Sequence, residues 1–490
     1  MFTWICPTTL AAATIAVSVS IDTNRLLLTS EANDLKETLC CRAYTPEDAP
    51  GVTDYPAGPY GNHNCDSPLS LEESLYAAIE HHAPGAAFTL FTGDIVEGVQ
   101  WLTTAKEIVA DIDSCYSHMR GLSVVYGAVG NHEANPVNSF PPQGVHTLAN
   151  QSNQYMYDTL AGNWFEWIGA EASATAVIRA GAYSVVHPGT CLRIISFNTQ
   201  FYMKENFWLY TPIMQWDPNG QLSWLISELQ HAEDARERVY LIGHMPMGAS
   251  DSLYDYSAYF DQIVQRYDAT IAALFFGHTH RDQWQIAYSD YTNQNFHTAT
   301  EVSYIAPALT PTSGNPTFRV YSVDPVTFAV LDYTVYYANM SLPNYQTDGP
   351  TWEKYYSVKE SYGPLLDPPY TSPAAELVPA FWHNLTEVFE IQDSVFQDYY
   401  ARKQRGYDPV LCTGSCKTEE ICGLRSSQSE YACFPEDNPV SVKKRGEGKK
   451  KHSHGDGSCP GSVALPVLRA LAVDIKGLQQ VLLQRRKYQM

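Results

Sequence analysis

Short hydrophobic runs alternate with segments of helical periodicity over most of the chain. Helical patterns at residues 69–83 and 101–119 lead into hydrophobic runs at residues 88–91 and 123–126. The alternation returns further along, with runs at residues 191–197, 238–242 and 271–276 and helical patterns at residues 221–232 and 257–267. Apolar side chains that recur every three to four positions indicate amphipathic helices, and short continuous runs indicate buried strands. The pattern therefore predicts an α/β architecture, a layered sandwich of β-sheets flanked by helices.

The pattern changes after residue 337, where the periodic strands are expected to stop. A connection rich in Pro and Tyr runs to residue 373, and helical patterns follow at residues 374–389 and 391–403. Four cysteines then fall within one short segment. We therefore predict a layered domain over residues 21–345 and a small helical, disulfide-bonded subdomain over residues 350–435.

The last part of the chain has the composition of a tail. Residues 436–461 are rich in Lys, Gly and His and predict a disordered, basic linker. Residues 462–490 predict an amphipathic helix with a basic end. Such a helix is more often solvated than docked on a membrane surface, and both interpretations stay open.

The first twenty residues have two interpretations. Residues 7–20 form an apolar run that is too short to span a bilayer. They resemble the hydrophobic part of a signal peptide, although the basic residues that usually precede it are missing. Alternatively, residues 13–21 form a core strand of the layered domain. We favour a signal peptide at residues 1–20, and we predict a strand at residues 26–29 in either case.

Four of the predicted strands end in a glycine followed by polar side chains. These endings are Gly93-Asp94, Gly130-Asn131-His132-Glu133, Gly243-His244 and Gly277-His278-Thr279-His280. Buried polar groups of this kind need a bound partner, and the carboxyl ends of strands are where open α/β sheets bind ligands. Carboxylate, amide and imidazole donors together suit Zn, Mn or Fe better than calcium. The sequence therefore predicts a metal centre at these strand ends.

The chain has 11 cysteines, which is many for a cytosolic enzyme. Cys412, Cys416, Cys422 and Cys433 are separated by four, six and eleven positions and lack the paired CxxC of a zinc ribbon. We therefore predict disulfides in this cluster. Three sequons for N-glycosylation also fit a secreted protein. Their acceptor residues are Asn150, Asn339 and Asn384.

The formal net charge of -22 is unevenly distributed. Residues 441–490 carry 11 Lys and Arg against 3 Asp and Glu, a net of +8, so the first 440 residues carry -30. An acidic body repels nucleic acid and anionic membranes at long range. We therefore expect no nucleic-acid partner, and at most a transient contact with a membrane surface.

The order of the four endings, GD, GNHE, GH and GHTH, resembles the signature of the calcineurin-like metallophosphoesterases. The longer strings GNHEANPVNSFPP, KENFW and FFGHTHRDQW are similar to the acid sphingomyelinase branch of that family. The resemblance extends over residues 25–435 and includes the paired Cys40 and Cys41. It implies that residues 21–345 are a metallophosphoesterase catalytic domain, and that the protein is secreted or enters an acidic vacuolar or lysosomal compartment.

The resemblance also assigns roles to the polar strand ends. Its expected metal ligands are Asp94, Asn131, His244, His278 and His280. The resemblance implies that Asp94 bridges two zinc ions. Asn131, His244 and His278 would complete the coordination of one ion, and His280 would ligate the other. Two such ions clamp the phosphoryl oxygens and lower the pKa of the water that attacks phosphorus.

His132 is implied to be catalytic and not a ligand. It is the candidate general acid that protonates the leaving alkoxide. Glu133 has two interpretations, because it either orients His132 or caps the following turn. Asn135, Asn138 and Phe140 lie where the substrate loop of the family falls, and the sequence does not distinguish substrate contact from scaffold.

The chain departs from the family at the first metal motif. An Asp-x-His is expected directly after the strand at residues 26–29, but the chain reads Ser30-Glu31-Ala32-Asn33 there and has no histidine before His63. Asp22 lies before that strand and has Asn24 at the histidine position, so it is a poor substitute. Because the loss of an imidazole ligand weakens a zinc site, we predict fewer than two bound metal ions per chain.

These observations predict a zinc-dependent phosphodiesterase that resembles acid sphingomyelinase and cleaves sphingomyelin to ceramide and phosphocholine. Only the residues before Arg25 precede the resemblance, too few for the lipid-extracting saposin-like domain of that branch. One alternative is therefore a relative that hydrolyses soluble nucleotide or choline-containing diesters. The other is a catalytically impaired binding protein, which the missing Asp-x-His suggests.

Overall fold

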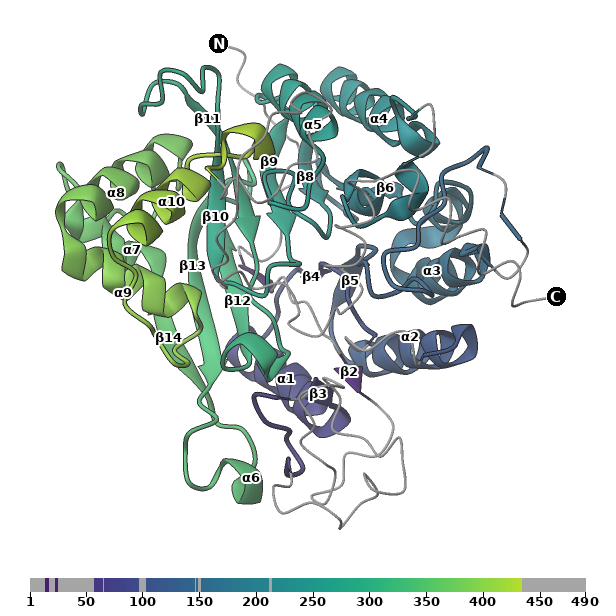
Figure 1. Ribbon diagram of the computed structural model, residues 1–490, viewed down its shortest axis with the longest axis horizontal. Coiled ribbons are helices and arrows are strands. Elements are labelled where there is room, and N and C mark those ends of the chain that lie inside the picture. Colours follow the sequence, from purple (N-terminus) through teal and green to yellow (C-terminus); the bar gives the residue numbers. More distant parts are fainter. Residues whose placement is uncertain are drawn as a thin grey trace, which may run out of the picture.

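Two six-stranded sheets form the centre of the molecule (Figure 1). The computed structural model describes residues 57–64, 66–96, 103–145, 147–148, 151–210 and 214–433, and the backbone of residues 14–16 and 23–24. The first sheet has the order β14 (Trp352–Ser357), β13 (Val330–Ala338), β12 (Thr317–Val323), β1 (Thr14–Ala16), β4 (Phe88–Phe91) and β5 (Val124–Gly127). The second has the order β10 (Gln283–Tyr288), β11 (Ala299–Ile305), β9 (Ile271–Phe276), β8 (Arg238–Ile242), β7 (Leu192–Ser196) and β6 (Tyr183–Val186). The α/β layered fold expected from the sequence is confirmed.

The strand β1 lies inside the first sheet. It pairs antiparallel with β12 and parallel with β4, where Ala16 faces Thr89. The described residues 14–16 form part of the core strand that one interpretation placed at residues 13–21, and the signal peptide at residues 1–20 stays a prediction. The predicted strand at residues 26–29 lies outside the described residues. A separate two-stranded sheet joins β2 (Thr23–Asn24) to β3 (Ser67–Pro68).

Parallel pairing brings the carboxyl ends of neighbouring strands together. In the first sheet β4 runs parallel to β5, with Phe91 opposite Gly127. In the second sheet β8 runs parallel to β9, with Ile242 opposite Phe275. The four polar endings predicted from the sequence therefore lie in two adjacent pairs, one pair on each sheet.

The two sheets pack against each other through buried side chains. The ring centroids of Phe275 and Tyr321, which come from different sheets, are 5.2 Å apart. At the other end, the carbonyl oxygen of Gly127 on β5 accepts hydrogen bonds of 2.9 Å from Tyr183 Oη and Ser196 Oγ on the second sheet. Because both sheets are held at these points, the strand ends that follow them have fixed relative positions.

Helices cover the outside of the strands, as Figure 1 shows. They are α1 (Leu69–His82), α2 (Ala105–Met119), α3 (Gln154–Ile178), α4 (Gln221–Ala235) and α5 (Tyr254–Arg266). The helix α2 begins later than predicted because Thr104 and Glu107 form a capping box at its start. The sequence interpretation omitted α3, whose two halves meet at Gly169, where φ is 77°. Among the described residues, no helix is both long and apolar enough to cross a membrane.

The C-terminal helices gather beside β10 and β14 (Figure 1). They are α7 (Val358–Tyr362), α8 (Pro379–Ile391), α9 (Asp393–Lys403) and α10 (Ser415–Leu424), after the short α6 (Tyr345–Asp348). The predicted disulfides are confirmed, as Cys412–Cys416 and Cys422–Cys433. The expectation that strands stop after residue 337 is wrong, because β14 adds an edge strand to the first sheet through its pairing with β13.

The end of the described chain packs against α5 through a buried carboxyl group. Tyr431 stacks on Tyr291 with ring centroids 4.8 Å apart, and Tyr291 Oη donates a 2.7 Å hydrogen bond to Asp261 Oδ1 on α5. Burial raises the pKa of Asp261 to about 6. Because the folded state binds this proton more tightly than the unfolded state, the resulting stability is complete below pH 4 and is lost as the pH rises through about 6.

We therefore expect the unfolding free energy of the wild type, relative to Asp261→Asn, to fall by up to about 3 kcal/mol between pH 4 and pH 7. Urea titrations of both proteins at several pH values measure this difference, and the other titrating groups cancel in it. A difference that stays constant over this range would contradict the assignment.

Candidate metal centre

Four electron-pair donors meet at the ends of β4, β5, β8 and β9. His244 Nε2 lies 2.9 Å from Asp94 Oδ2, 2.9 Å from Asn131 Oδ1 and 3.1 Å from His278 Nδ1. Asn131 Oδ1 and His278 Nδ1 are also 3.1 Å apart. Asp94 and His244 are almost completely buried. The structure thus brings together four of the five ligands predicted from the sequence.

The outer hydrogen bonds of these side chains direct their lone pairs inward. His244 Nδ1 lies 2.7 Å from the carbonyl oxygen of Thr92, so Nδ1 carries the proton and Nε2 faces the cluster. Asn131 Nδ2 donates a 2.9 Å hydrogen bond to Asn138 Oδ1, which leaves Asn131 Oδ1 facing the cluster. Partners of this kind orient the ligands of metal sites in proteins.

The carboxylates around His278 favour a positive charge in this cluster. Burial opposes a charge on His278, but the carboxylates of Asp251 and Asp94 outweigh it and raise the pKa of His278 to about 9. Burial likewise opposes ionisation of Asp94, and the imidazoles of His244 and His132 nevertheless lower its pKa. Two imidazole nitrogens, a carboxylate and an amide oxygen fit a divalent cation, which would displace the proton from His278.

His280 is not one of the mutually close donors of this cluster, although it interacts electrostatically with Asp94 and His278. The group of close His, Cys, Asp and Glu donors found in the described part of the chain contains Asp94, His244 and His278, and not His280. His280 is buried, and burial and the nearby Arg405 guanidinium lower its pKa. Its role as a ligand of another ion stays a prediction from the family resemblance.

Four residues at this site have a left-handed backbone conformation. They are Asp94, Asn138, His278 and His280, with φ between 56° and 69°. Residues other than glycine rarely adopt this conformation, and such strain is typical of functional sites.

Glu133 joins the loops that follow β4 and β5. Its carboxylate accepts backbone N–H groups from Gly130 at 2.6 Å, Asp94 at 3.2 Å and Ile95 at 2.5 Å. Burial and the neighbouring Asp94 raise the pKa of Glu133 to about 8. Glu133 therefore fixes Gly130 and the loop that carries Asp94. The sequence had suggested instead that Glu133 orients His132 or caps the following turn.

His132 lies next to the cluster. Its backbone N–H donates a 3.0 Å hydrogen bond to Asp94 Oδ1, and the residue is buried. Burial lowers the pKa of His132, and the charge of Asp94 opposes this effect. The position fits a proton donor beside a metal-bound group, and the catalytic role itself stays a prediction.

The loop after His132 serves as scaffold in the structure. Asn138 binds Asn131 through Oδ1 and donates from Nδ2 to Glu205 Oε2 at 2.8 Å. Phe140 is fully buried, and Asn135 Nδ2 donates to a backbone carbonyl. These contacts favour the scaffold interpretation that the sequence left open.

Sequence reasoning missed Asp251 and Glu205. Asp251 Oδ2 lies 2.5 Å from His278 Nε2, and Glu205 holds Asn138 behind Asn131. Both lie in loops and not at the predicted strand ends. Of these two residues, Glu205 had a signal in the sequence, because it lies in the KENFW string that is similar to the acid sphingomyelinase branch.

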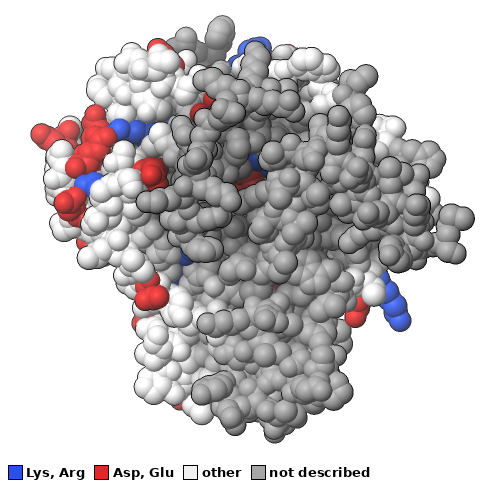
Figure 2. Space-filling view, in the orientation of Figure 1, with Lys and Arg blue, Asp and Glu red and all other residues white. Residues whose placement is uncertain are grey.

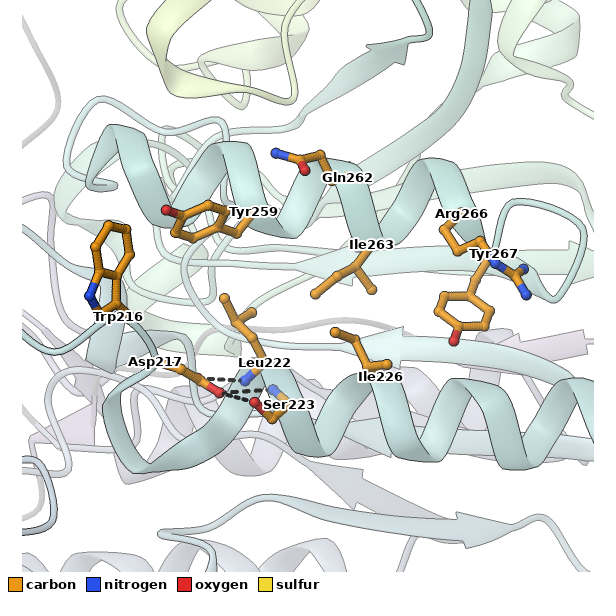
Figure 3. A pocket seen from close by; sticks show the side chains of 10 residues that line it. All are labelled: Trp216, Asp217, Leu222, Ser223, Ile226, Tyr259, Gln262, Ile263, Arg266 and Tyr267. Carbon is orange, nitrogen blue, oxygen red and sulfur yellow. Dashed lines mark hydrogen bonds between the residues drawn. The ribbon is translucent and has the colours of Figure 1, made fainter.

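A groove of about 390 Å³ lies elsewhere, between α4 and α5 (Figure 3). Trp216 and Tyr259 stand at one end, and Leu222, Ile226 and Ile263 form the apolar floor. The lining residues include none of the strand-end ligands. The groove is therefore separate from the chemistry of the candidate metal centre.

Comparisons with known proteins agree with this geometry. Residues 70–282 match the calcineurin-like phosphoesterase family, and residues 292–436 match the acid sphingomyelin phosphodiesterase C-terminal region. The chain thus contains a metallophosphoesterase domain, a class whose members use divalent metal ions. With both regions matched in order, the chain belongs to the acid sphingomyelinase branch of the calcineurin-like phosphoesterases.

Individual relatives support this assignment. The chain is 35% identical over 412 residues to the sphingomyelin phosphodiesterase of Homo sapiens, covering 81% of this chain and 61% of the relative. It is 30% identical to sphingomyelin phosphodiesterase 1 of Caenorhabditis elegans, covering 81% of this chain and 67% of the relative. It is 28% identical to human acid sphingomyelinase-like phosphodiesterase 3b, covering 75% and 80%. The chain thus spans about three fifths of the length of the human sphingomyelin phosphodiesterase.

Proposed function

We propose that the protein is a zinc-dependent phosphodiesterase that hydrolyses sphingomyelin to ceramide and phosphocholine. The observation that carries the proposal is the cluster of Asp94, Asn131, His244 and His278. In this cluster Nε2 of His244 lies 2.9 to 3.1 Å from a donor atom of each of the other three side chains. Membership of the acid sphingomyelinase branch supports the choice of substrate. Zinc is proposed because two imidazoles and two oxygen donors suit it.

Each residue of the site has a distinct task in this proposal. The four converging residues hold the ion, which, when bound, polarises the phosphodiester and lowers the pKa of a bound water. His132, beside Asp94, gives a proton to the leaving alkoxide of ceramide. Glu133 keeps the loop of Asp94 in place.

The first metal motif of the family has no good match in this chain. Asp22 is a poor substitute for its aspartate, because Asn24 stands in the histidine position. We therefore propose that the second site, to which the resemblance assigns His280, is weakened, and that the chain tightly holds fewer than two ions.

A phosphodiesterase of soluble nucleotide or choline-containing diesters is the second candidate. The observation that favours it is the net charge of -30 over the first 440 residues, which disfavours approach to an anionic membrane but not binding of a soluble diester. A catalytically impaired binding protein is the third candidate, because Asn24 replaces the histidine of the first motif.

Secretion, or delivery to an acidic vacuole or lysosome, fits the two disulfides of the C-terminal region. Figure 2 shows Asp and Glu side chains gathered at the left of the face drawn, where the C-terminal helices lie, with few Lys or Arg among them. An acidic surface of this kind repels anionic lipids, so we propose only transient contact with membranes.

Hydrolysis of sphingomyelin vesicles and of a soluble chromogenic phosphodiester, each with and without added zinc, separates the three candidates. We expect zinc-dependent release of phosphocholine from the vesicles. Cleavage of the soluble diester alone would favour the second candidate. Activity on neither substrate in the presence of zinc would contradict the proposed function and favour a binding protein.

A further inference from the structure

Asp251 contacts the candidate metal centre from the same loop as His244, seven residues further along the chain. The loop connects β8 to α5, and the Asp251 carboxylate lies 2.5 Å from His278 Nε2. Since a carboxylate only accepts, His278 donates from Nε2. The other ring nitrogen, Nδ1, then points to His244 and Asn131, where the ion is proposed to bind.

Two chain segments hold Asp251 in this position. Lys204 N donates to the backbone carbonyl of Asp251 at 2.7 Å, and Lys204 Nζ donates to the carbonyl of Ser250 at 2.5 Å. The neighbours of Lys204 and Asp251 also pair, because Met203 forms an antiparallel bridge with Ser252. We call residues 202–206 and 250–253 the clasp.

The clasp reaches two of the proposed ligands. Asp251 contacts His278 directly. Glu205, on the opposite segment, accepts from Asn138 Nδ2 at 2.8 Å, and Asn138 in turn binds Asn131. One small paired structure therefore orients a ligand from β9 and a ligand from β5.

We propose that Asp251 is a positioning residue for the metal centre. It fixes the ring orientation of His278, directs the Nδ1 lone pair to the ion, and so sets the affinity of the site for zinc. The proposal rests on the proposed metal-dependent function. Loss of a carboxylate behind a metal-bound histidine weakens metal affinity by about 10- to 100-fold.

The test compares zinc affinity in Asp251→Ala, Asp251→Asn and the wild type. Each protein is stripped with a chelator and titrated with Zn²⁺ against a competing indicator. We expect Asp251→Ala to raise the Kd by about 10- to 100-fold and Asp251→Asn to raise it less, because the amide oxygen still accepts from Nε2. Turnover of both variants should recover when zinc is added in excess.

The control is Asp255→Asn, which removes an exposed carboxylate on α5 and should keep the wild-type Kd. Melting midpoints of the zinc-free proteins separate positioning from general destabilisation, since positioning changes the Kd without changing the midpoint. An unchanged Kd in Asp251→Ala, or a Kd raised only in step with a lowered midpoint in both Asp251 variants, would overturn the proposal. A wild type that binds no zinc would instead overturn the proposed function.

Discussion

His132→Ala is expected to lower turnover of the preferred phosphodiester by about two to four orders of magnitude. The proposed task of His132 is to protonate the leaving alkoxide, a step that no water replaces efficiently in a buried site. The side chain is not among the four converging donors, so metal content should stay at the wild-type level. Turnover and zinc per chain are measured on the same preparation.

His231→Ala, an exposed histidine on α4, is the control and should leave both quantities unchanged. Undiminished turnover in His132→Ala would show that the general acid is another group. A loss of zinc together with turnover would show that His132 belongs to the metal-binding set.

Gly130→Ala is expected to abolish metal binding and to destabilise the protein by about 3 kcal/mol. A Cβ atom at this position would lie 2.1 Å from Asp94 Oδ1, 2.3 Å from Asp94 N and 2.6 Å from Glu133 Oε2. The methyl group would therefore displace both the proposed ligand and the carboxylate that holds its loop. Zinc titration and the thermal midpoint measure the two effects.

Gly162→Ala is the matched control, because Gly162 is exposed within α3 and a Cβ there meets no atom within 4 Å. Alanine in a helix interior should stabilise the protein by about 0.5 to 1 kcal/mol and leave zinc binding intact. A Gly130→Ala protein with wild-type zinc affinity and midpoint would mean that the loops do not meet as described.

The strand ends were predictable because their signal is local. Each ends with a glycine and a ligand-type side chain directly after a hydrophobic run, and parallel pairing of β4 with β5 and of β8 with β9 brings them together. The clasp was not predictable in this way. Asp251 reaches His278 only because its loop pairs with residues far away in the sequence, near Lys204.

The strands β1 and β14 show a second limit. An apolar run such as residues 7–20 fits both a signal peptide, which we favoured, and a buried strand, and the pairing of residues 14–16 with β4 and β12 could not be predicted from the run itself. The edge strand β14 carries exposed Glu353 and Lys354, so its sequence lacks the hydrophobic run that marks central strands.

The number of zinc ions held by the purified protein tests the central claim most directly. Elemental analysis after dialysis against a buffer without zinc is expected to give about one ion per chain, and His244→Ala should lose it, because Nε2 of His244 faces all three other donors. Two tightly held ions would show that the first motif is intact in another form. A wild type that holds no zinc would contradict the metal centre itself.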